Sequence, residues 1–556
     1  MTDLRKTTSV LVVDDEKLIR LTLCAKLKKA GYDPVAVESV EEAVTLLKKS
    51  STAFCSIISD IMMGDMDGFV FRDIVRGFDN SMPFFFMTAL DPEEGSGFLK
   101  RIISDPMSYY LPKSAGTDVL IERMKRVVAS RRIGQFIERQ VAETRQSLAL
   151  AAHIQHSLLP PRAAIEDGFF YTSRWLPKET ISGDLFEAAP CGDGRELFIV
   201  GDIQGHGTSA ALAMTAVQSF LKNISRGGGQ QDLEPQHIAN LLQRFFRANL
   251  AEVSYMTAVI CIYDWKKNEV SWITCGAPGL EVVSGGKYIE ANPWKLGGLP
   301  IGLMPDTVYG PDDVVQTKLP EDAVCIVYTD GITDLSRDAE GLEKIPPQLL
   351  RRLRAELAAE AVDNCSRFAI PHKTVNACEA MGYGKYQDDI TEFVFGPNRR
   401  NPEIFETSVC ISPAAIDAAA REAAAWCSAH GWSEDIAGRI QLVIEEKLMN
   451  VHDHGFDDRD RMREVAGLRL RRRGADATLT VWDAGTPEPS LEVAAGSAET
   501  AFELANRAMN NHGRGRLMLR EICRGVERKR FGNLNETVYH VPFDASAAAE
   551  GAGERK

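Results

Sequence analysis

The sequence predicts a multidomain chain, with α/β folds towards its two ends and an α+β fold between them. Short β-rich runs alternate with amphipathic stretches over residues 9–113, a long segment without proline follows, and β-rich runs separated by Gly-Asp and Asp-Gly turns fill residues 169–397. A polar bridge at 397–402 then leads to alanine-rich helices and further strands. At 556 residues the chain is too long for one hydrophobic core, since a domain usually takes about 100 to 200 residues.

These composition shifts divide the chain into five parts. We expect an α/β domain at 1–118, a helical linker at 119–160, a mixed domain at 161–397, a second α/β domain at 403–545 and a disordered tail at 546–556. The tail is assigned from its Ala, Gly and charged residues, which cannot bury enough apolar surface to fold.

The composition also excludes several classes of function. A net charge of -14 argues against a nucleic-acid or anionic-membrane partner, because either requires a basic face. No apolar run approaches the roughly 20 residues that span a bilayer, and the first residues lack the segments of a signal peptide. The 11 cysteines include no C-x-x-C pair, which argues against a structural zinc site. We therefore expect a cytoplasmic protein with free thiols.

In the first domain, each strand-like run ends in a polar residue. These residues are Asp14 and Asp15, Asp60, Thr88 and Lys113. The carboxyl ends of the strands of a doubly wound sheet meet in one crevice, where clustered carboxylates hold Mg²⁺. One carboxylate, most naturally Asp60, can then attack phosphorus while the Lys and Thr neutralise the phosphoryl oxygens. For Asp14 and Asp15 taken alone, a simple turn is the alternative.

This arrangement resembles response-regulator receiver domains, with residues 60–68 as the phosphorylation loop and Tyr110 as the switch aromatic residue. The resemblance implies a flavodoxin-like fold, Asp60 as phosphoacceptor, bound Mg²⁺ and a sensor histidine kinase as phosphodonor. Gly64, where the family usually has proline, and Ser114 after the lysine depart from the pattern. Neither departure removes a catalytic group.

Residues 120–158 contain no proline and predict a long helix, which Pro160 and Pro161 end. An apolar stripe with 4-3-4-3 spacing runs along it: Ile137, Val141, Thr144, Leu148 and Ala151. Such spacing is typical of a coiled-coil seam and would make a homodimer. Because the stripe includes Thr and Ala, packing of one helix on its own domain is the open alternative.

One motif recurs in the middle domain: a hydrophobic strand flanked by aspartate. The aspartates in question are Asp184, Asp202, Asp330, Asp388 and Asp389. Gly-Asp and Asp-Gly are ordinary turn dipeptides, so a turn is the alternative at each position. Together, however, they form an oxygen-only ligand set, which favours Mg²⁺ or Mn²⁺ over zinc. Two such ions can lower the pKa of a bridging water and hold a phosphoryl group, which predicts phosphate-ester hydrolysis.

The order of the motifs at 182–184, 201–207, 328–333 and 388–391, preceded by 154–160, resembles the PPM (type 2C) protein phosphatases of the stage II sporulation protein E branch. The resemblance implies an α-β-β-α sandwich and a metal-dependent serine/threonine phosphatase with two Mn²⁺ or Mg²⁺ ions. Asp184 and Asp202 then bridge the ions and the Ile203 carbonyl supports one, while Asp330 and Asp388, with Asp389 beside it, complete the site. Residues 274–278 lack the family's histidine, and Glu187 stands where aspartate is common.

The last domain carries a third set of motifs. Glu446 and Asn450 are four residues apart and share one face of a helix. Glu446 could orient or deprotonate a nucleophile while Asn450 contacts Mg²⁺. Asp483, two residues before Gly485, follows a strand, where a buried carboxylate can accept a hydrogen bond from the amino group of adenine.

Gly513 and Gly515 precede an expected helix at 517–523 and would let phosphate approach backbone N–H groups, although a lone Gly-x-Gly more often marks a loop. In series these motifs resemble the GHKL ATPase superfamily and, more closely, the anti-sigma-factor serine kinases. That resemblance implies a GHKL-type α/β sandwich that binds ATP with Mg²⁺. A histidine kinase is disfavoured, because no acidic residue follows His156 and a whole domain separates it from the ATP motifs.

Together the three resemblances imply a two-component response regulator of the partner-switching kind. Its phosphorylation would control a phosphatase that acts on a small anti-sigma-factor antagonist. The terminal domain would act oppositely on the same partner as a serine kinase, with an anti-sigma or sigma factor as a further candidate partner. The alternative is a phosphatase whose terminal domain is a non-catalytic module that sequesters a regulatory partner.

Overall fold

The computed structural model describes residues 8–49, 54–63, 67–88, 101–102, 104–205, 207–226, 233–250, 255–289, 298–361, 363–398, 401–456, 464–486, 519, 522–531 and 534–543. They fall into two compact units, 1–146 and 147–556. No helix among the described residues is long and apolar enough to cross a membrane. The expected tail at 546–556, Gly513, Gly515 and most of the expected helix at 517–523 lie outside the described residues.

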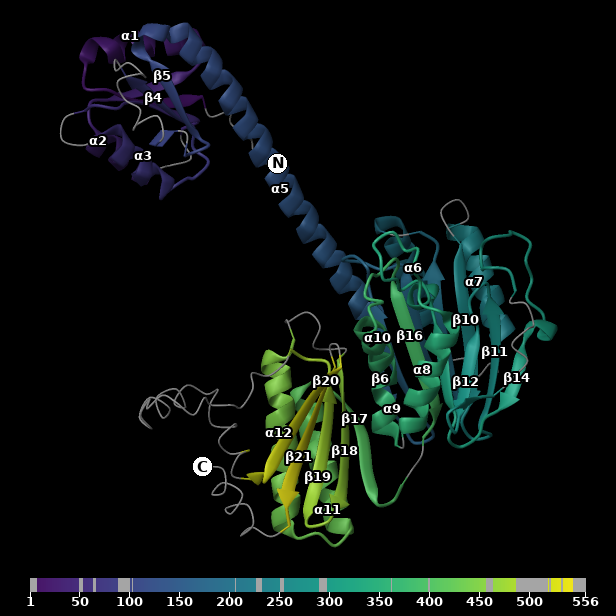
Figure 1. The fold of residues 1–556 in the computed structure, drawn as a ribbon. Helices are drawn as coiled ribbons and strands as arrows, with labels where there is room; N and C mark the ends of the chain where they lie inside the picture. The colour runs from purple at the N-terminus through teal and green to yellow at the C-terminus, as the bar shows by residue number, and fades with distance from the viewer. Residues whose placement is uncertain are drawn as a thin grey trace. The chain divides into compact units, whose positions relative to one another are not determined.

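The first unit contains a parallel sheet with the strand order β2-β1-β3-β4-β5, of which Figure 1 labels β4 and β5. Its strands are β1 (Ser9–Val13), β2 (Asp33–Val37), β3 (Ser56–Asp60), β4 (Phe84–Thr88) and β5 (Ser108–Pro112), and its helices include α1 (Lys17–Lys29), α2 (Val40–Lys49) and α3 (Gly68–Arg76). Phe84 and Phe86 pack on one side of the sheet and Phe85 on the other. Both faces are covered, which is why β4 is continuously apolar. The flavodoxin-like prediction is confirmed.

Helix α5 (Thr117–Leu158) is the long helix that the sequence predicts. Its first turns bury Leu120, Met124 and Val128 in the core of the first unit. Ile137 and Val141 of the apolar stripe are 54% and 43% exposed. They are available to a second helix, and the coiled coil stays a prediction.

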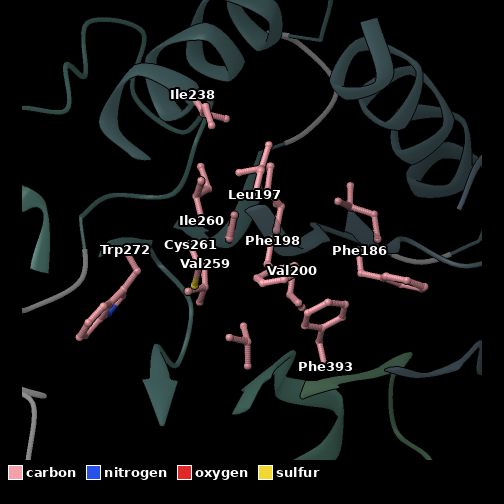
Figure 2. Close-up of a cluster of buried hydrophobic side chains, with 14 of the residues drawn as sticks. Phe186, Leu197, Phe198, Val200, Ile238, Val259, Ile260, Cys261, Trp272 and Phe393 are labelled. Atoms are coloured by element: carbon pink, nitrogen blue, oxygen red, sulfur yellow. The ribbon is translucent and has the colours of Figure 1, made fainter. Parts of the chain in front are cut away.

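The second unit begins with two antiparallel sheets, in the orders β14-β11-β10-β9-β8 and β13-β12-β15-β16-β7-β6. The strands are β6 (Ala163–Ile165), β7 (Phe169–Leu176), β8 (Asp184–Gly192), β9 (Arg195–Ile203), β10 (Met256–Asp264), β11 (Glu269–Cys275), β12 (Leu280–Ser284), β13 (Lys287–Tyr288), β14 (Val315–Lys318), β15 (Val324–Tyr328) and β16 (Ile390–Pro397). The core between the sheets joins Phe186 and Phe198 to Phe393 (Figure 2). This part of the chain is the predicted mixed domain.

Helices cover the outer faces of both sheets. Helices α6 (Thr208–Arg226) and α7 (Pro235–Asn249) pack on the first sheet, and α8 (Pro347–Glu360) and α10 (Ile370–Ala380) pack on the second. The α-β-β-α sandwich is therefore confirmed. Its strands are apolar over long stretches of sequence because each sheet is buried on both faces.

The last domain is an antiparallel sheet with the order β17-β18-β19-β21-β20. Its elements are β17 (Ile404–Cys410), α11 (Pro413–Ala429), α12 (Glu434–His454), β18 (Val465–Arg473), β19 (Asp476–Asp483), β20 (Gly525–Phe531) and β21 (Leu534–Pro542). Each helix begins at a serine whose hydroxyl accepts a hydrogen bond from the first turn, Ser412 for α11 and Ser433 for α12. Both helices share one apolar core with the sheet, as expected of a two-layer α/β sandwich, and Figure 1 shows α11 and α12 beside the strands.

Short helix α9 (Asn364–Phe368) joins the sandwich to the last domain within the second unit. Asp363, which caps it, forms an ion pair with Arg469 of β18, and the Cys365 N–H donates to Glu406 of β17 at 3.0 Å. Phe368 packs in a buried cluster with Trp482. The two domains therefore share a buried contact.

Candidate functional site

The receiver residues meet at the carboxyl ends of β1, β3 and β5. Ligand oxygens of Asp14, Asp15 and Asp60 all lie within 4.8 Å of one another. Lys113 Nζ lies 2.6 Å from Asp60 Oδ2 and 3.2 Å from Asp14 Oδ2. Thr88 ends β4, and its side chain lies outside the described residues, whereas Tyr110 on β5 is half-buried against the core. The structure thus brings the predicted carboxylates and ammonium together.

Electrostatics at this crevice suit a divalent cation. Burial raises the pKa of Asp14 above its ordinary value. Burial lowers the pKa of Lys113, but the hydrogen bond and charge of Asp60 outweigh it, so the net shift is upward. Three crowded carboxylates beside one ammonium form the oxygen-rich site that Mg²⁺ prefers.

The phosphatase aspartates come from neighbouring strand ends in both sheets. Asp184 of β8 is directly paired with Asp202 of β9 in the strand register. Asp330 follows β15 and Asp388 precedes β16, and these two strands are neighbours in the other sheet. The structure therefore brings together the aspartates that the sequence predicts as ligands.

These carboxylates crowd one another. Burial, followed by the charge of Asp202, raises the pKa of Asp184 well above its ordinary value. Burial, with the charges of Asp330 and Asp388, raises the pKa of Asp202 to about 7. A bound cation would offset the repulsion between these carboxylates. Because their ligand atoms are all hard oxygens, the residues present fit Mg²⁺ or Mn²⁺. Ile203 follows Asp202 and ends β9, and the role of its carbonyl as a metal ligand stays a prediction.

Two threonines that the sequence reasoning missed fix Asp184. Thr329 Oγ1 and Thr391 Oγ1 donate to Asp184 Oδ2 at 2.8 and 2.7 Å. The Thr391 N–H in turn donates to Thr329 Oγ1 at 2.9 Å. All three side chains are buried. Both hydroxyls donate to Oδ2 and thereby fix the orientation of the carboxylate that would hold a cation.

Asp389 differs from its neighbour Asp388, because backbone N–H groups engage both of its oxygens. Lys178 N donates to Oδ1 at 2.7 Å and Gly183 N to Oδ2 at 2.8 Å. Asp389 thereby holds the loop that leads into Asp184. A Cβ at Gly331 would lie 1.8 Å from the Asp389 carbonyl oxygen, which explains the glycine after Asp330.

Gln155 connects the end of α5 to the phosphatase site. Its side chain is buried, and Nε2 donates to Ser182 O at 2.8 Å and to Ala211 O at 3.1 Å. Oε1 accepts from Ser182 N at 3.1 Å. The neighbouring His156 ring lies edge-on to Trp175, whose Nε1 donates to Asp184 O at 3.1 Å.

In the last domain, Glu446 and Asn450 share a face of α12 as predicted, with Asn450 Nδ2 3.4 Å from Glu446 Oε1. Asp483 ends β19 and is buried. Its Oδ1 accepts from Asn535 Nδ2 at 2.9 Å and from Gly485 N at 3.1 Å. Its Oδ2 lies 3.1 Å from Nζ of Lys447, a residue that the sequence reasoning passed over. Oδ2 is buried and has no hydrogen-bond partner among the described residues, so it fits an incoming N–H donor such as the amino group of adenine.

Comparison with known families identifies three matches along the chain. Residues 10–125 match the response regulator receiver domain, residues 192–396 match stage II sporulation protein E, and residues 411–539 match the histidine kinase-like ATPase domain. The three matches follow the order of the three domains predicted from the sequence.

Two of the curated relatives are phosphoserine phosphatases. The phosphoserine phosphatase RsbU of Bacillus subtilis is 21% identical over 39% of this chain and 62% of its own length. The phosphoserine phosphatase RsbP of the same organism is 27% identical over 34% of this chain and 46% of its own. A crystal structure of the RsbU and RsbW domains of Rv1364c from Mycobacterium tuberculosis is 17% identical, covering 69% of this chain and 96% of that one with a TM-score of 0.37. The chain spans less than two thirds of either phosphatase relative.

Proposed function

Since the chain joins a receiver domain, a stage II sporulation protein E-type phosphatase domain and a histidine kinase-like ATPase domain, we propose that it is a response regulator whose phosphorylation controls dephosphorylation of a phosphoserine or phosphothreonine protein. Asp60 is the proposed phosphoacceptor, and a sensor histidine kinase is the proposed phosphodonor. The two relatives are phosphoserine phosphatases by name, which supports phosphoserine as the substrate class.

The observation that carries the proposal is the pairing of Asp184 with Asp202 next to Asp330 and Asp388. These four residues would hold two Mg²⁺ or Mn²⁺ ions, which when bound supply a water of lowered pKa and hold phosphoryl oxygens. Thr329 and Thr391 orient Asp184 through its second oxygen.

We propose that the substrate is a small anti-sigma-factor antagonist, the partner that the combination of phosphatase and kinase-like domains implies. An anti-sigma or sigma factor is a further candidate partner of the terminal domain. Glu446 and Asn450 share a face of α12, which supports a serine-kinase activity of that domain acting oppositely on the same partner, with a non-catalytic partner-binding module as the alternative. Mass spectrometry of the protein that co-purifies with the full chain, including its phosphorylation state, identifies the partner.

The metal assignment is tested with a phosphoserine peptide and Mn²⁺. Asp202→Ala and Asp330→Ala should abolish turnover, because each removes an oxygen ligand, while both proteins stay folded. Asp306→Ala is a matched control, since Asp306 is a largely exposed aspartate of the same domain. Full activity of the Asp202→Ala protein, or undiminished wild-type activity in the presence of a metal chelator, would refute the metal assignment.

Receiver control is tested by the phosphatase rate with and without acetyl phosphate. Wild type should change its rate and Asp60→Ala should not, because phosphorylation can shift the receiver population only through that carboxylate. Leu148→Asp places a charge in the proposed dimer seam and should abolish the response and the dimer together. A normal response in Leu148→Asp would remove the coiled-coil route and leave receiver control standing.

The serine-kinase activity that would oppose the phosphatase is tested by phosphotransfer. Labelled phosphate transferred from ATP to the partner protein, and lost in Glu446→Gln because an amide cannot act as a base, would establish it. Absence of transfer in wild type would favour the binding module.

A further inference from the structure

A cavity of about 450 Å³ opens at one end of the sandwich domain. It is lined by residues from the end of β8, including Pro190, and by Glu196 near the start of β9. The metal aspartates lie at the other ends of these two strands, since Asp184 begins β8 and Asp202 lies next to the last residue of β9. The cavity is therefore separate from the proposed phosphatase site, and no step of that activity uses it.

Aromatic side chains form much of the wall of this cavity. Phe169 and Tyr171 come from β7 of the second sheet, and Trp265 follows β10 of the first. The Tyr171 ring stacks on Phe393 with the ring centroids 5.5 Å apart. A Cβ at Gly168 would lie 2.2 Å from the Trp265 ring, so that ring packs directly against backbone. These contacts fix the aromatic wall, which offers a ligand apolar surface and few oxygen atoms.

Every charged side chain among the lining residues is acidic, namely Glu166, Asp167, Asp193 and Glu196. Asp193 is paired at 2.6 Å with Lys266, and both of these side chains are exposed. The Glu196 carboxylate, in contrast, forms no hydrogen bond or ion pair within the part of the chain that the structure describes. Burial, followed by the charge of Glu166, raises the pKa of Glu196 to about 7. A partly buried carboxylate without a counter-charge is unfavourable, and a bound cation would offset that cost.

The hydroxyl of Tyr171 is a second polar group without a partner. Tyr171 is 7% exposed, and its hydroxyl makes no hydrogen bond with any residue that the structure describes. Burial, followed by the charges of Glu196, Glu187 and Glu166, raises the pKa of this phenol, so it stays neutral. Buried tyrosine hydroxyls usually find a partner, and this one lies among carboxylates. A neutral hydroxyl and an unpaired carboxylate can together accept the hydrogen bonds that an ammonium donates.

We propose that this cavity binds a primary alkylammonium group. The ammonium would donate to Glu196 and Tyr171, with the exposed Glu166 adding a second negative charge nearby. The methylene stem would pack on Pro190 and Trp265, and a cation close to a tryptophan ring gains a further attraction. A divalent metal ion fits less well, because Ca²⁺ takes about six to eight oxygen ligands and the aromatic wall supplies only the phenol oxygen.

Titration calorimetry of the full chain with spermidine tests the proposal, at about pH 8, where the Glu196 carboxylate is ionised. Wild type should bind saturably at physiological salt, which screens non-specific attraction to an acidic protein. Glu196→Gln should bind at least about tenfold more weakly, because a hydrogen bond to a charged group is lost, and Tyr171→Phe should also bind more weakly. Glu340→Gln removes an exposed glutamate of the same domain and should bind as wild type does.

A second probe, Nα-acetyllysine amide, distinguishes the two sources of a primary ammonium. Tighter binding of this probe than of spermidine supports a lysine side chain of a partner protein as the ligand, and the reverse supports a free polyamine. Absence of saturable binding of both probes, or equal affinity in wild type and Glu196→Gln, would overturn the proposal. Tighter binding of Ca²⁺ than of spermidine, lost in Glu196→Gln, would also overturn it.

If Glu196→Gln does not fold by circular dichroism, Glu166→Gln gives the contrast at an exposed position and should likewise weaken binding. Unchanged spermidine affinity in Glu166→Gln and in Tyr171→Phe would then overturn the proposal. Phosphatase turnover, measured on the same preparations, reports separately on the proposed function.

Discussion

The hydroxyl of Thr391 offers the sharpest test of how the phosphatase site is held. Thr391→Val keeps the shape of the side chain and removes the donor that lies 2.7 Å from Asp184 Oδ2. Thr329 remains as the second donor to that oxygen. Asp184 keeps its position in the strand register but loses one of the two hydroxyl donors to Oδ2 that orient its carboxylate.

A hydrogen bond to a charged group contributes about 1.5–3 kcal/mol. At about 1.4 kcal/mol per tenfold, this predicts a fall in apparent Mn²⁺ affinity, or in turnover at limiting Mn²⁺, of roughly 10- to 100-fold. The fall should reach at least the lower end of this range, because Asp184 is buried and water cannot replace the lost donor. Thr391→Ser keeps the hydroxyl and should recover most of the loss.

The assay is phosphoserine-peptide hydrolysis over a range of Mn²⁺ concentrations. Thr172→Val is the matched control, because Thr172 is also buried and donates at 3.0 Å to Phe368 O, away from the aspartates. It should lower stability without changing the dependence on Mn²⁺. A Thr391→Val protein with the wild-type Mn²⁺ profile would refute the idea that the hydroxyl orients Asp184.

Three further changes test other contacts of the second unit. Gln155→Leu removes three buried hydrogen bonds to the loop before Asp184 and to α6. Each group left unsatisfied costs about 1–3 kcal/mol, so the phosphatase rate should fall about tenfold or more. An unchanged rate would contradict this prediction. Arg354→Met leaves the fully buried Glu392 without the guanidinium partner that lies 2.7 Å away. The free energy of unfolding, measured by urea titration, should therefore fall by about 3–5 kcal/mol. A loss below about 1 kcal/mol would contradict this prediction. Gly331→Ala should abolish turnover in a folded protein, since its Cβ would overlap the Asp389 carbonyl; retained activity would mean that the backbone there can shift.

The receiver and phosphatase ligand sets could be predicted because their signal is local. A carboxylate directly after a hydrophobic strand, as Asp60 and Asp202 are, is recognisable from a few adjacent residues. The topology then decides which strand ends meet, and the parallel order of the first sheet is one of few that a doubly wound domain adopts.

The residues that the sequence did not reveal act across long separations. Thr329 and Thr391 are ordinary strand residues until the register of β15 and β16 places both hydroxyls on Asp184. Lys447 looked like one more charged residue on a helix, because a helical pattern does not reveal that its ammonium is buried beside Asp483. The distinction between Asp388 and Asp389 likewise depends on the Gly183 N–H, which only the fold brings near.

The edges of the last sheet limit where a protein partner can bind. An exposed edge strand can pair with a strand of another chain, and charged side chains discourage this. The β17 edge contacts the sandwich domain of the same chain, where Ile165 N donates to Ser408 Oγ at 2.9 Å. The opposite edge, β20, exposes the charged run of residues 527–530. Strand addition is therefore disfavoured at both edges of this sheet.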